Sequence, residues 1–578
     1  FYFIFYPRVC DVHGNSKRGT STSTQTTESG MAAKVDRQVD RLVDMLNAVV
    51  TIRERTLTPQ MEVASRKRSQ SNQGVGQQKS TKEDGAQRVS QTTLTCRPTN
   101  YQNTTASTRH KVAIVAVASR LLVVAFAIVC NLLIPDHNAN VKVYAGSHFG
   151  ASSAPSVLQT FTRWDSAQFL TIAEYGYVEE SSHAFFPLWP NMLRVSANLI
   201  GNRFRAWMTY QEQLVFFGVV LANVCFVIAT IALYELGALV MKDSRISFHS
   251  CILLCLNPAN IFMTTTYSES LYMATSFVGL FLLLHSRATS DFSSFGTSCK
   301  TTIEFCGALV CLAAASATRS VGLTNCIIAA WPLVCWGFTR LGLPAKPKVQ
   351  ATFAQHLRWV GVEGCVLGAV VVATWGPLAW HDMNGVTQFC TNITKTGETP
   401  LWCTESALPS LYTHVQRKYW NVGPFMYWKI KQIPNFILVL PVVIIGGDVV
   451  HAILKHVHER CTSMRLTSTK LRNQGVLRRL TQNIATLATV FTATGWGLSG
   501  HLLTKSPNTN TVTNSRMIDS ARGTRLPLSA IPFVAVWIAL TLAGVVVYNV
   551  QVTTRIVFAS CPAIYWHLSL LLLDPQTP

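Results

Sequence analysis

The run Val112-Ala-Ile-Val-Ala-Val-Ala-Ser-Arg-Leu-Leu-Val-Val-Ala-Phe-Ala-Ile-Val-Cys-Asn-Leu-Leu-Ile134 is the first stretch of this sequence long enough to cross a membrane as a helix. A hydrocarbon layer about 30 Å thick needs about 20 mostly apolar residues. The composition of all 578 residues agrees, because 49% are hydrophobic and only 13% are charged, with a mean hydropathy of +0.25. An ordinary soluble protein has about 25% charged residues. The sequence therefore predicts an all-α polytopic membrane protein.

Further apolar runs predict more membrane helices along the chain. The runs of sufficient length lie at 214–240, 263–285, 321–339, 359–380, 434–450, 480–503, 528–549 and 556–573. Three shorter runs, at 186–200, 250–262 and 304–318, are ambiguous between spans and shorter buried or re-entrant segments. Residues 7–110 instead have the polar composition of a disordered segment. We therefore divide the chain into a basic and polar tail over 1–110 and a multi-span domain over 111–578.

The net charge of +21 does not indicate a nucleic-acid partner, because the basic residues form no single patch interleaved with aromatic residues. They lie between the predicted spans instead. The loops at 339–358 and 451–479 are strongly basic, and the positive-inside rule places both in the cytosol.

The direction of each span follows from these two loops. If the tail is cytosolic and 186–200 is only an interfacial or re-entrant segment, the spans alternate so that both basic loops are cytosolic. A full span at 186–200 would place both in the lumen. The preferred count gives about eleven helices, a first luminal loop at 135–213 and a large luminal loop at 381–433.

Two cysteines bracket a polar part of the large luminal loop. Cys390 and Cys403 predict a disulfide if this loop lies in an oxidising compartment, and two unpaired thiols are the alternative. The same loop carries the glycosylation sequon Asn392-Ile393-Thr394. A second sequon at Asn103 lies in the tail, where we expect it to be unused.

Several polar residues near predicted helix ends fall on the luminal side. The group Arg163-Trp164-Asp165 follows the first span, and Tyr267 and Glu269 follow the helix-breaking Asn257-Pro258. Arg319 lies between two apolar runs and could bind a phosphate. Polar residues at membrane depth usually face a cavity or a partner. Each group also has a structural interpretation, as an ion pair with an interfacial Trp, a kinked helix, or an Arg that reaches the interface.

The stretch from Tyr419 to Phe436 is the densest in aromatic and polar residues before a span. Sugar stacking and binding of an anionic lipid headgroup would both suit this composition, and an interfacial aromatic belt with flanking lysines would look similar. The substrate-binding candidates within it are Tyr419, Trp420, Asn421, Lys431 and Gln432.

These segments together resemble the GPI mannosyltransferase II family. The matching motifs occur in the family's order over roughly 112–573, and no single one is specific. They are Arg163-Trp164-Asp165 with Gly176-Tyr177, Ala184-Phe185-Phe186-Pro187-Leu188, Asn257-Pro258-Ala259 with Tyr267-Ser268-Glu269-Ser270-Leu271, Arg319-Ser320 with Gly322-Leu323, Tyr419-Trp420-Asn421-Val422-Gly423 with Lys431-Gln432-Ile433-Pro434-Asn435-Phe436, and Thr554-Arg555 with Tyr565-Trp566. Family members usually continue into another hydrophobic segment, whereas this sequence stops at Pro578.

The resemblance implies a GT-C type glycosyltransferase of the endoplasmic reticulum membrane. Such an enzyme would transfer the second mannose, in α-1,6 linkage, from dolichyl-phosphate mannose to the mannosylated GPI lipid precursor in the lumen. It would need no cofactor, and we expect no metal because no Asp-x-Asp motif is present at the first luminal loop. A small membrane subunit is a further partner that the resemblance allows.

The implied reaction inverts the anomeric carbon in one displacement. Asp165 is the first candidate for the base and Glu269 the second. Arg319, Arg163 and Lys431 are candidates to stabilise the departing phosphate. The alternatives are a dolichyl-phosphate-mannose user of the N-glycan pathway, a non-catalytic subunit of a lipid-glycan complex, and a secondary transporter.

Overall fold

The computed structural model describes the chain in eight stretches, at residues 99–134, 157–204, 206–289, 299–342, 353–391, 400–404, 409–466 and 526–573. Every regular element in these residues is a helix, which confirms the predicted all-α class. The predicted span at 480–503 and most of the predicted tail lie outside the described residues.

The described residues contain helices that can cross a membrane, so the prediction of a multi-pass membrane protein is confirmed. Five are long and apolar enough, or six if one bent pair counts as a single span. The five lie in α3 (Thr99–Leu133), α6 (Tyr210–Met241), α9 (Cys299–Thr318), α11 (Phe353–Val386) and α13 (Ile433–Leu466). The predicted count of about eleven is not confirmed.

The ambiguous run at 250–262 does not form one continuous span, because its helix is interrupted at the predicted helix breaker Asn257-Pro258. Helix α7 (Ser244–Cys255) ends before Asn257, and the 3-10 turn η5 (Asn260–Met263) follows. The Asn257 side chain accepts the Ala259 N–H at 2.7 Å and so closes the turn around Pro258. Helix α8 (Glu269–Thr289) begins only after this break, which places Glu269 in its first turn.

The predicted span at 556–573 is also interrupted. Helices α18 (Val550–Ser560) and α19 (Pro562–Leu573) meet at an angle of 77°. Proline lacks an N–H and keeps the preceding residue out of the helical region, so the chain turns at Cys561. The neighbouring predicted runs become α17 (Ile531–Val546) and, after the turn η6 (Ser320–Thr324), α10 (Asn325–Gly342).

Helix α17 runs in the direction opposite to the predicted one. If the predicted spans simply alternated, α17 would be parallel to α13. The chain before α13 hydrogen-bonds the last carbonyls of α17, from Gly423 N–H to Val547 at 2.8 Å and from Trp428 Nε1–H to Val545 at 2.7 Å. The start of α13 therefore lies beside the end of α17, and the two helices are antiparallel. As a consequence α18 begins at the same end as the large luminal loop.

Short helices occupy the described residues 157–204 of the first predicted luminal loop. They are η2 (Val157–Phe161), α4 (Asp165–Tyr175), η3 (Glu180–Ala184), α5 (Leu188–Leu199) and η4 (Gly201–Phe204). With 12 residues α5 is too short to cross a membrane, as expected for 186–200. At the other end of the bundle α3 begins at Thr99, upstream of the predicted tail boundary, and Arg109 forms an ion pair with Glu235 of α6.

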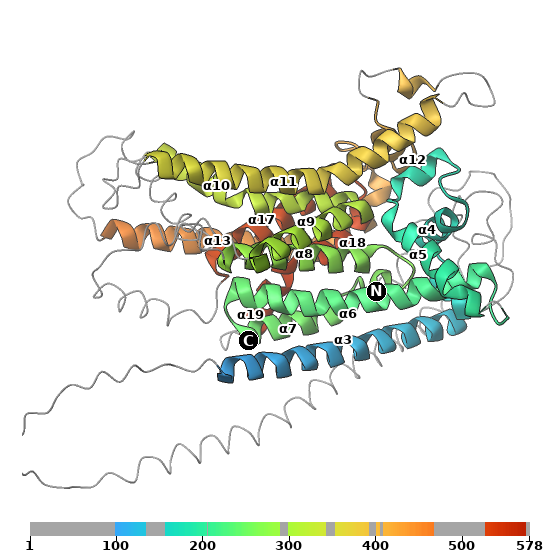
Figure 1. The fold of residues 1–578 in the computed structure, drawn as a ribbon, viewed down its shortest axis with the longest axis horizontal. Coiled ribbons are helices and arrows are strands. Elements are labelled where there is room, and N and C mark those ends of the chain that lie inside the picture. Colours follow the sequence, from blue (N-terminus) through green and yellow to red (C-terminus); the bar gives the residue numbers. More distant parts are fainter. Residues whose placement is uncertain are drawn as a thin grey trace, which may run out of the picture. The chain divides into compact units, whose positions relative to one another are not determined.

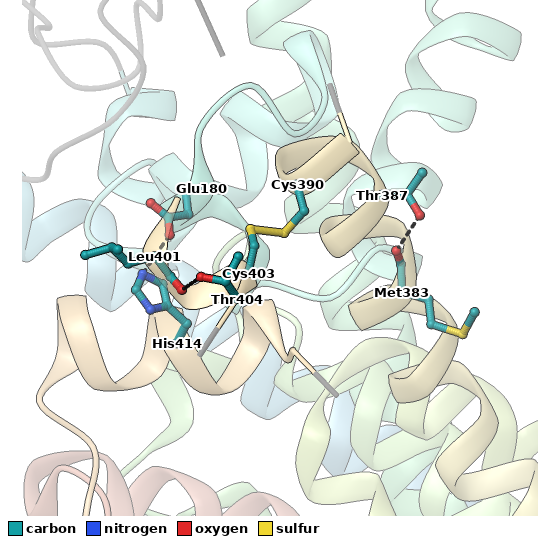
Figure 2. Close-up of a disulfide and its surroundings, with 8 residues drawn as sticks. All are labelled: Glu180, Met383, Thr387, Cys390, Leu401, Cys403, Thr404 and His414. Carbon is teal, nitrogen blue, oxygen red and sulfur yellow. Dashed lines mark hydrogen bonds and ion pairs between the residues drawn. A yellow bond between two sulfur atoms is a disulfide. The ribbon is translucent and has the colours of Figure 1, made fainter. Parts of the chain in front are cut away.

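Neighbouring long helices pack along their lengths, α3 against α6, α6 against α8, and α8 against α9 (Figure 1). The end of α11 continues into the π-helical turn Thr387–Thr391. There Cys390 forms a disulfide with Cys403, as predicted, next to helix α12 (Leu411–Trp420) (Figure 2). The sequon at Asn392 lies outside the described residues.

Gly322 allows α9 and η6 to pack closely where Arg319 joins them. A Cβ at this position would lie 2.6 Å from Ser316 Cα and 2.7 Å from Ser316 N, both backbone atoms that cannot rotate away. We expect Gly322→Ala to cost about 1–3 kcal/mol by overpacking and to lower the melting temperature of the purified protein in detergent.

Gly307 in α9 is the matched control for this prediction. A Cβ there would lie 3.4 Å from Leu282 Cδ1, which is an ordinary contact. Gly307→Ala should leave the melting temperature unchanged or raise it, because alanine is the better helix former. Equal melting temperatures for Gly322→Ala and the wild type would contradict the proposed close packing.

Candidate functional site

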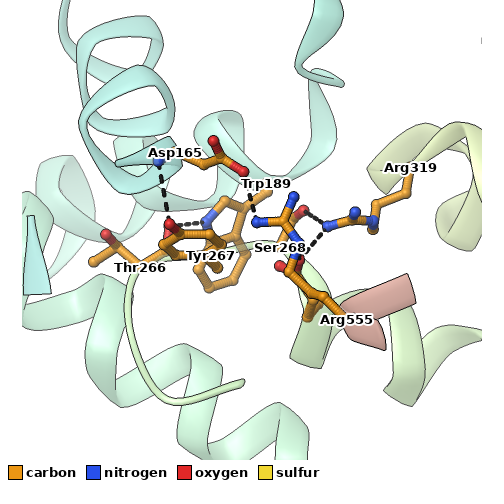
Figure 3. A network of polar contacts seen from close by, with 8 residues as sticks. Asp165, Trp189, Thr266, Tyr267, Ser268, Arg319 and Arg555 are labelled. Atoms are coloured by element: carbon orange, nitrogen blue, oxygen red, sulfur yellow. Dashed lines mark hydrogen bonds and ion pairs between the residues drawn. The ribbon is translucent and has the colours of Figure 1, made fainter. Parts of the chain in front are cut away.

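Two arginines and two carboxylates meet in one cluster, three of them from helix ends and Arg555 from the middle of α18. Figure 3 labels Asp165, Arg319 and Arg555 of this group. Arg555 Nη1 lies 2.7 Å from Asp165 Oδ2, and Arg555 Nε lies 3.1 Å from Glu269 Oε1. Arg319 Nη1 lies 2.6 Å from the same Glu269 oxygen. The structure therefore joins three residues predicted for the site, Asp165, Glu269 and Arg319, through a fourth, Arg555. We call these four residues the ion-pair cluster.

Each carboxylate of the cluster begins a helix. Glu269 is the first residue of α8, and Asp165 is the first residue of α4. A helix N-terminus carries partial positive charge and unpaired N–H groups, which favour an anion. The backbone N–H of Asp165 donates to the Tyr267 hydroxyl at 3.2 Å, so Tyr267 connects the segment before α8 to the start of α4.

The residue before Asp165 has an unusual backbone. Trp164 has φ of 55°, a value that side-chain-bearing residues adopt rarely. This conformation turns the chain from η2 into α4 and places Asp165 at the cluster. Arg163 and Trp164, both predicted to bind substrate, are half-buried on this turn.

The segment 257–268 leads into the ion-pair cluster, and contacts with other parts of the chain fix this segment in place. Thr266 accepts from Trp189 Nε1 at its carbonyl, at 2.9 Å, and donates through its hydroxyl to the Phe161 carbonyl at 2.9 Å. On another side, Arg120 of α3 donates to Thr264 Oγ1 at 2.9 Å. The break between α7 and α8 is thus held in a defined conformation by contacts with three other parts of the chain.

The four side chains differ in their access to solvent. Glu269 is fully buried, Arg555 and Arg319 are 13% and 16% exposed, and Asp165 is 32% exposed. A buried carboxylate must be paired, and the two arginines supply that pairing for Glu269. Asp165 is the carboxylate that an incoming molecule can reach. The rings of Tyr267 and Phe262 lie 5.4 Å and 5.2 Å from the Arg555 guanidinium carbon, within cation–π range.

The predicted substrate-binding residues of the large luminal loop lie outside the ion-pair cluster. Tyr419 donates to Glu180 at 3.3 Å, and the Trp420 ring lies 5.9 Å from that of Phe185. Asn421 ends α12 in the left-handed conformation, with φ of 55°, and donates to the Met426 carbonyl.

The other two residues of that set begin α13. Lys431 is exposed in the turn η9 (Ile430–Gln432), and Gln432 accepts from Asn435 at 2.6 Å. The structure places none of the five residues in the ion-pair cluster, and their role in substrate binding stays a prediction.

Helix α12 is fastened to the first luminal loop through Glu180. His414 Nε2 lies 2.8 Å from one Glu180 oxygen, and Lys418 Nζ lies 3.0 Å from the other. Burial opposes the charged form of Lys418, but the hydrogen bond and charge of Glu180 outweigh it and raise the Lys418 pKa. The Trp402 ring, beside the disulfide, stacks on His414 with centroids 5.3 Å apart.

No group of three or more His, Cys, Asp or Glu side chains could hold a metal ion within the part of the chain that the structure describes. The positive charge at the cluster comes from arginine guanidinium groups. Arginine presents paired N–H donors that match the oxygens of a phosphate.

The sequence matches the model of one protein family, described as mannosyltransferase (PIG-V), over residues 109–578. The chain belongs to this family. The described part of the match contains the break at 257–268 and all four members of the ion-pair cluster.

Individual members of the family are similar over part of their length. A GPI alpha-1,6-mannosyltransferase 2 from Mus musculus is 30% identical over 356 residues, which is 57% of this chain and 66% of the mouse protein. The Homo sapiens protein of the same name is 29% identical over 360 residues, 58% and 67% of the two chains. A GPI mannosyltransferase 2 from Cryptococcus neoformans is 32% identical over 298 residues, 50% and 61% of the two chains. The alignments thus span about two thirds of these relatives.

Arg555 is the member of the cluster that sequence reasoning did not assign to the site. It stands in the family motif Thr554-Arg555, and it is a charged residue between two apolar runs. The same pattern identified Arg319. Alternation of the predicted spans put Arg555 at the opposite end of the bundle, and the antiparallel packing of α13 and α17 corrects this.

The two carboxylates of the cluster should differ in their contribution to stability. Glu269→Gln leaves two buried arginines without their shared anion, and we expect a loss of about 3–5 kcal/mol. Asp165→Asn should cost less, because Asp165 is partly exposed and water can solvate Arg555. Melting temperatures of the two purified variants in detergent provide the comparison. A larger loss for Asp165→Asn would contradict this assignment of roles.

Proposed function

We propose that this protein transfers the second mannose of the GPI anchor, in α-1,6 linkage, from dolichyl-phosphate mannose to the GPI precursor. The ion-pair cluster carries the proposal, because it combines a partly exposed carboxylate with two largely buried arginines in a chain of the mannosyltransferase family. The names of the mouse and human relatives support a GPI acceptor and the α-1,6 linkage, and the name of the fungal relative supports the GPI acceptor.

Asp165 acts as the base in the proposed reaction. An acceptor hydroxyl attacks the anomeric carbon of the donor mannose, its proton passes to Asp165, and the carbon–oxygen bond to phosphate breaks with its electron pair on the phosphate. One displacement converts the β-linked donor into an α-linked product. Asp165 Oδ2 is paired with Arg555, and the carboxylate is partly exposed toward an incoming hydroxyl.

Arg319 and Arg555 bind the donor phosphate in this proposal. Two arginines and two carboxylates have no net charge together, and the phosphodiester of the donor adds one negative charge. After transfer the phosphate monoester carries two negative charges, while Asp165 has become neutral by taking the proton. The total charge at the site is the same before and after the reaction, so no charge has to enter or leave a poorly solvated region. The proposed reaction uses no metal or cofactor.

The lumen of the endoplasmic reticulum is the proposed location of the site. A disulfide such as Cys390–Cys403 persists in an oxidising compartment, and this one lies at the end of α11, next to α12. Tyr412 of α12 hydrogen-bonds Ser320, the residue after Arg319, so the disulfide and the cluster are connected through α12. The lipid substrates would approach within the membrane. The resemblance adds a small membrane subunit as a proposed partner.

The function is tested by transfer from dolichyl-phosphate mannose to a one-mannose GPI precursor in membranes. We expect Asp165→Asn to lower the rate by about 10²–10⁴-fold, the usual contribution of a positioned base, while the protein remains folded. Asp448→Asn is the control. Asp448 of α13 pairs with His567 of α19 and is not a member of the ion-pair cluster. Full activity of Asp165→Asn would remove Asp165 from the mechanism.

The lipids that accumulate on depletion separate the alternatives. A one-mannose GPI intermediate supports the proposal, whereas truncated N-glycan lipids would indicate the other class of dolichyl-phosphate-mannose user. An unchanged lipid profile with altered solute uptake would indicate a transporter.

The proposed orientation is tested by glycosylation. Asn392→Gln should remove one glycan, seen as a faster-migrating band that glycosidase treatment of the wild type reproduces. Asn103→Gln should leave the migration unchanged, because Asn103 precedes the first span on the proposed cytosolic side. A glycan at Asn103 would place the chain in the reverse orientation.

A further inference from the structure

Helix α12 reaches from the disulfide region back to the ion-pair cluster through one side chain. The Tyr412 hydroxyl donates to Ser320 Oγ at 2.8 Å, and Ser320 directly follows Arg319. This bond joins residues 92 positions apart in the sequence. Neither residue has a role in the proposed chemistry.

The position of Tyr412 is fixed from two other directions. Its backbone N–H donates to Asp382 Oδ1 of α11 at 2.8 Å. Its ring packs edge-on against Phe186, with centroids 5.6 Å apart. Removal from water raises the pKa of Tyr412, so its hydroxyl stays protonated and can donate to Ser320.

The helix that carries Tyr412 is itself braced. Figure 2 shows the disulfide, and His414 near Glu180, beside α12. The stack of Trp402 on His414 and the contact of Lys418 with Glu180 also hold α12 or the segment before it. Tyr412 therefore extends from a fixed element and not from a free loop.

Ser320 begins η6 directly after Arg319, at the short backbone joint between α9 and η6. The Arg319 N–H donates to the Ala315 carbonyl of α9, and the Arg319 carbonyl accepts the Gly322 N–H at 3.0 Å. The Arg319 backbone is extended, with φ of −155°, between a helix and a 3-10 turn. A bond to the next side chain limits rotation of this joint and hence the reach of Arg319 toward Glu269 and Ser268.

We propose that Tyr412 is a positioning residue, which acts through Ser320 to hold Arg319 at the place where a phosphodiester anion binds. This inference rests on the proposed function of Arg319 as part of the donor site. It assigns to α12 and its disulfide a role in donor affinity that the ion-pair cluster alone does not supply.

The test compares donor KM and acceptor KM for Tyr412→Phe, Ser320→Ala and the double variant in membranes. Loss of one neutral hydrogen bond corresponds to about a two- to tenfold change. We expect each single variant to raise donor KM by that factor with acceptor KM unchanged, and the double variant to match the singles, because all three lose the same bond.

Tyr177→Phe is the control for a general loosening of the luminal region. The Tyr177 hydroxyl also bonds a neighbour, the Phe185 carbonyl at 2.7 Å, but it does not contact Ser320. Its loss should leave donor KM unchanged.

The variant Arg319→Gln distinguishes a failure of the proposed positioning role of Tyr412 from a failure of the proposed phosphate-binding role of Arg319. If Arg319→Gln raises donor KM and Tyr412→Phe and Ser320→Ala do not, the positioning role is overturned and the donor site stands. If Arg319→Gln leaves donor KM unchanged, the phosphate role of Arg319 is overturned as well. Multiplicative effects in the double variant would also overturn the inference, since the two residues would then act separately.

Discussion

The burial of Glu269 constrains the rest of the site. A carboxylate with no contact to solvent is costly unless cations and hydrogen-bond donors surround it, and neither α8 nor the segment before it provides a cation at this point. Arg319 comes from the end of α9 and Arg555 from α18, so three parts of the chain must meet at the N-terminus of α8. Asp165 completes the group by pairing with the remaining side of Arg555.

The break between α7 and α8 explains how Glu269 comes to be buried at a helix N-terminus inside the bundle. A continuous helix through 250–285 would satisfy its backbone internally and would present no helix N-terminus inside the bundle. The turn around Pro258 releases backbone and side-chain groups, which then bind Arg120, Trp189 and the backbone near Phe161. The cost of the break is thus offset by contacts that place the first turn of α8 beside the first turn of α4.

Sequence reasoning identified the parts of the site whose signal is local. Asp165, Glu269 and Arg319 are charged residues beside apolar runs, and the structure brings them together. Arg555 has the same local signal, but its side of the membrane depended on the number of spans before it, and hydropathy could not resolve that number. The run at 250–262 stayed ambiguous in the sequence, because its hydropathy allowed a span whereas Asn257-Pro258 predicted a helix break. The substrate-binding role of Trp420 and Lys431 stays a prediction, because a sugar site and an interfacial loop share this composition.

Asp165 and Glu269 each begin a helix, but their surroundings differ, and the roles proposed for them differ accordingly. Glu269 shares two arginines and has no exposed atoms, so its charge is committed to orienting those arginines. Asp165 shares one arginine and remains partly open, so it can receive a proton without leaving a buried cation unpaired. If the proposed roles were exchanged, protonation of Glu269 would remove the anion between Arg319 and Arg555 at the proposed step in which both face the departing phosphate. Burial therefore favours Asp165 as the proposed base and Glu269 as the proposed anchor of the two arginines.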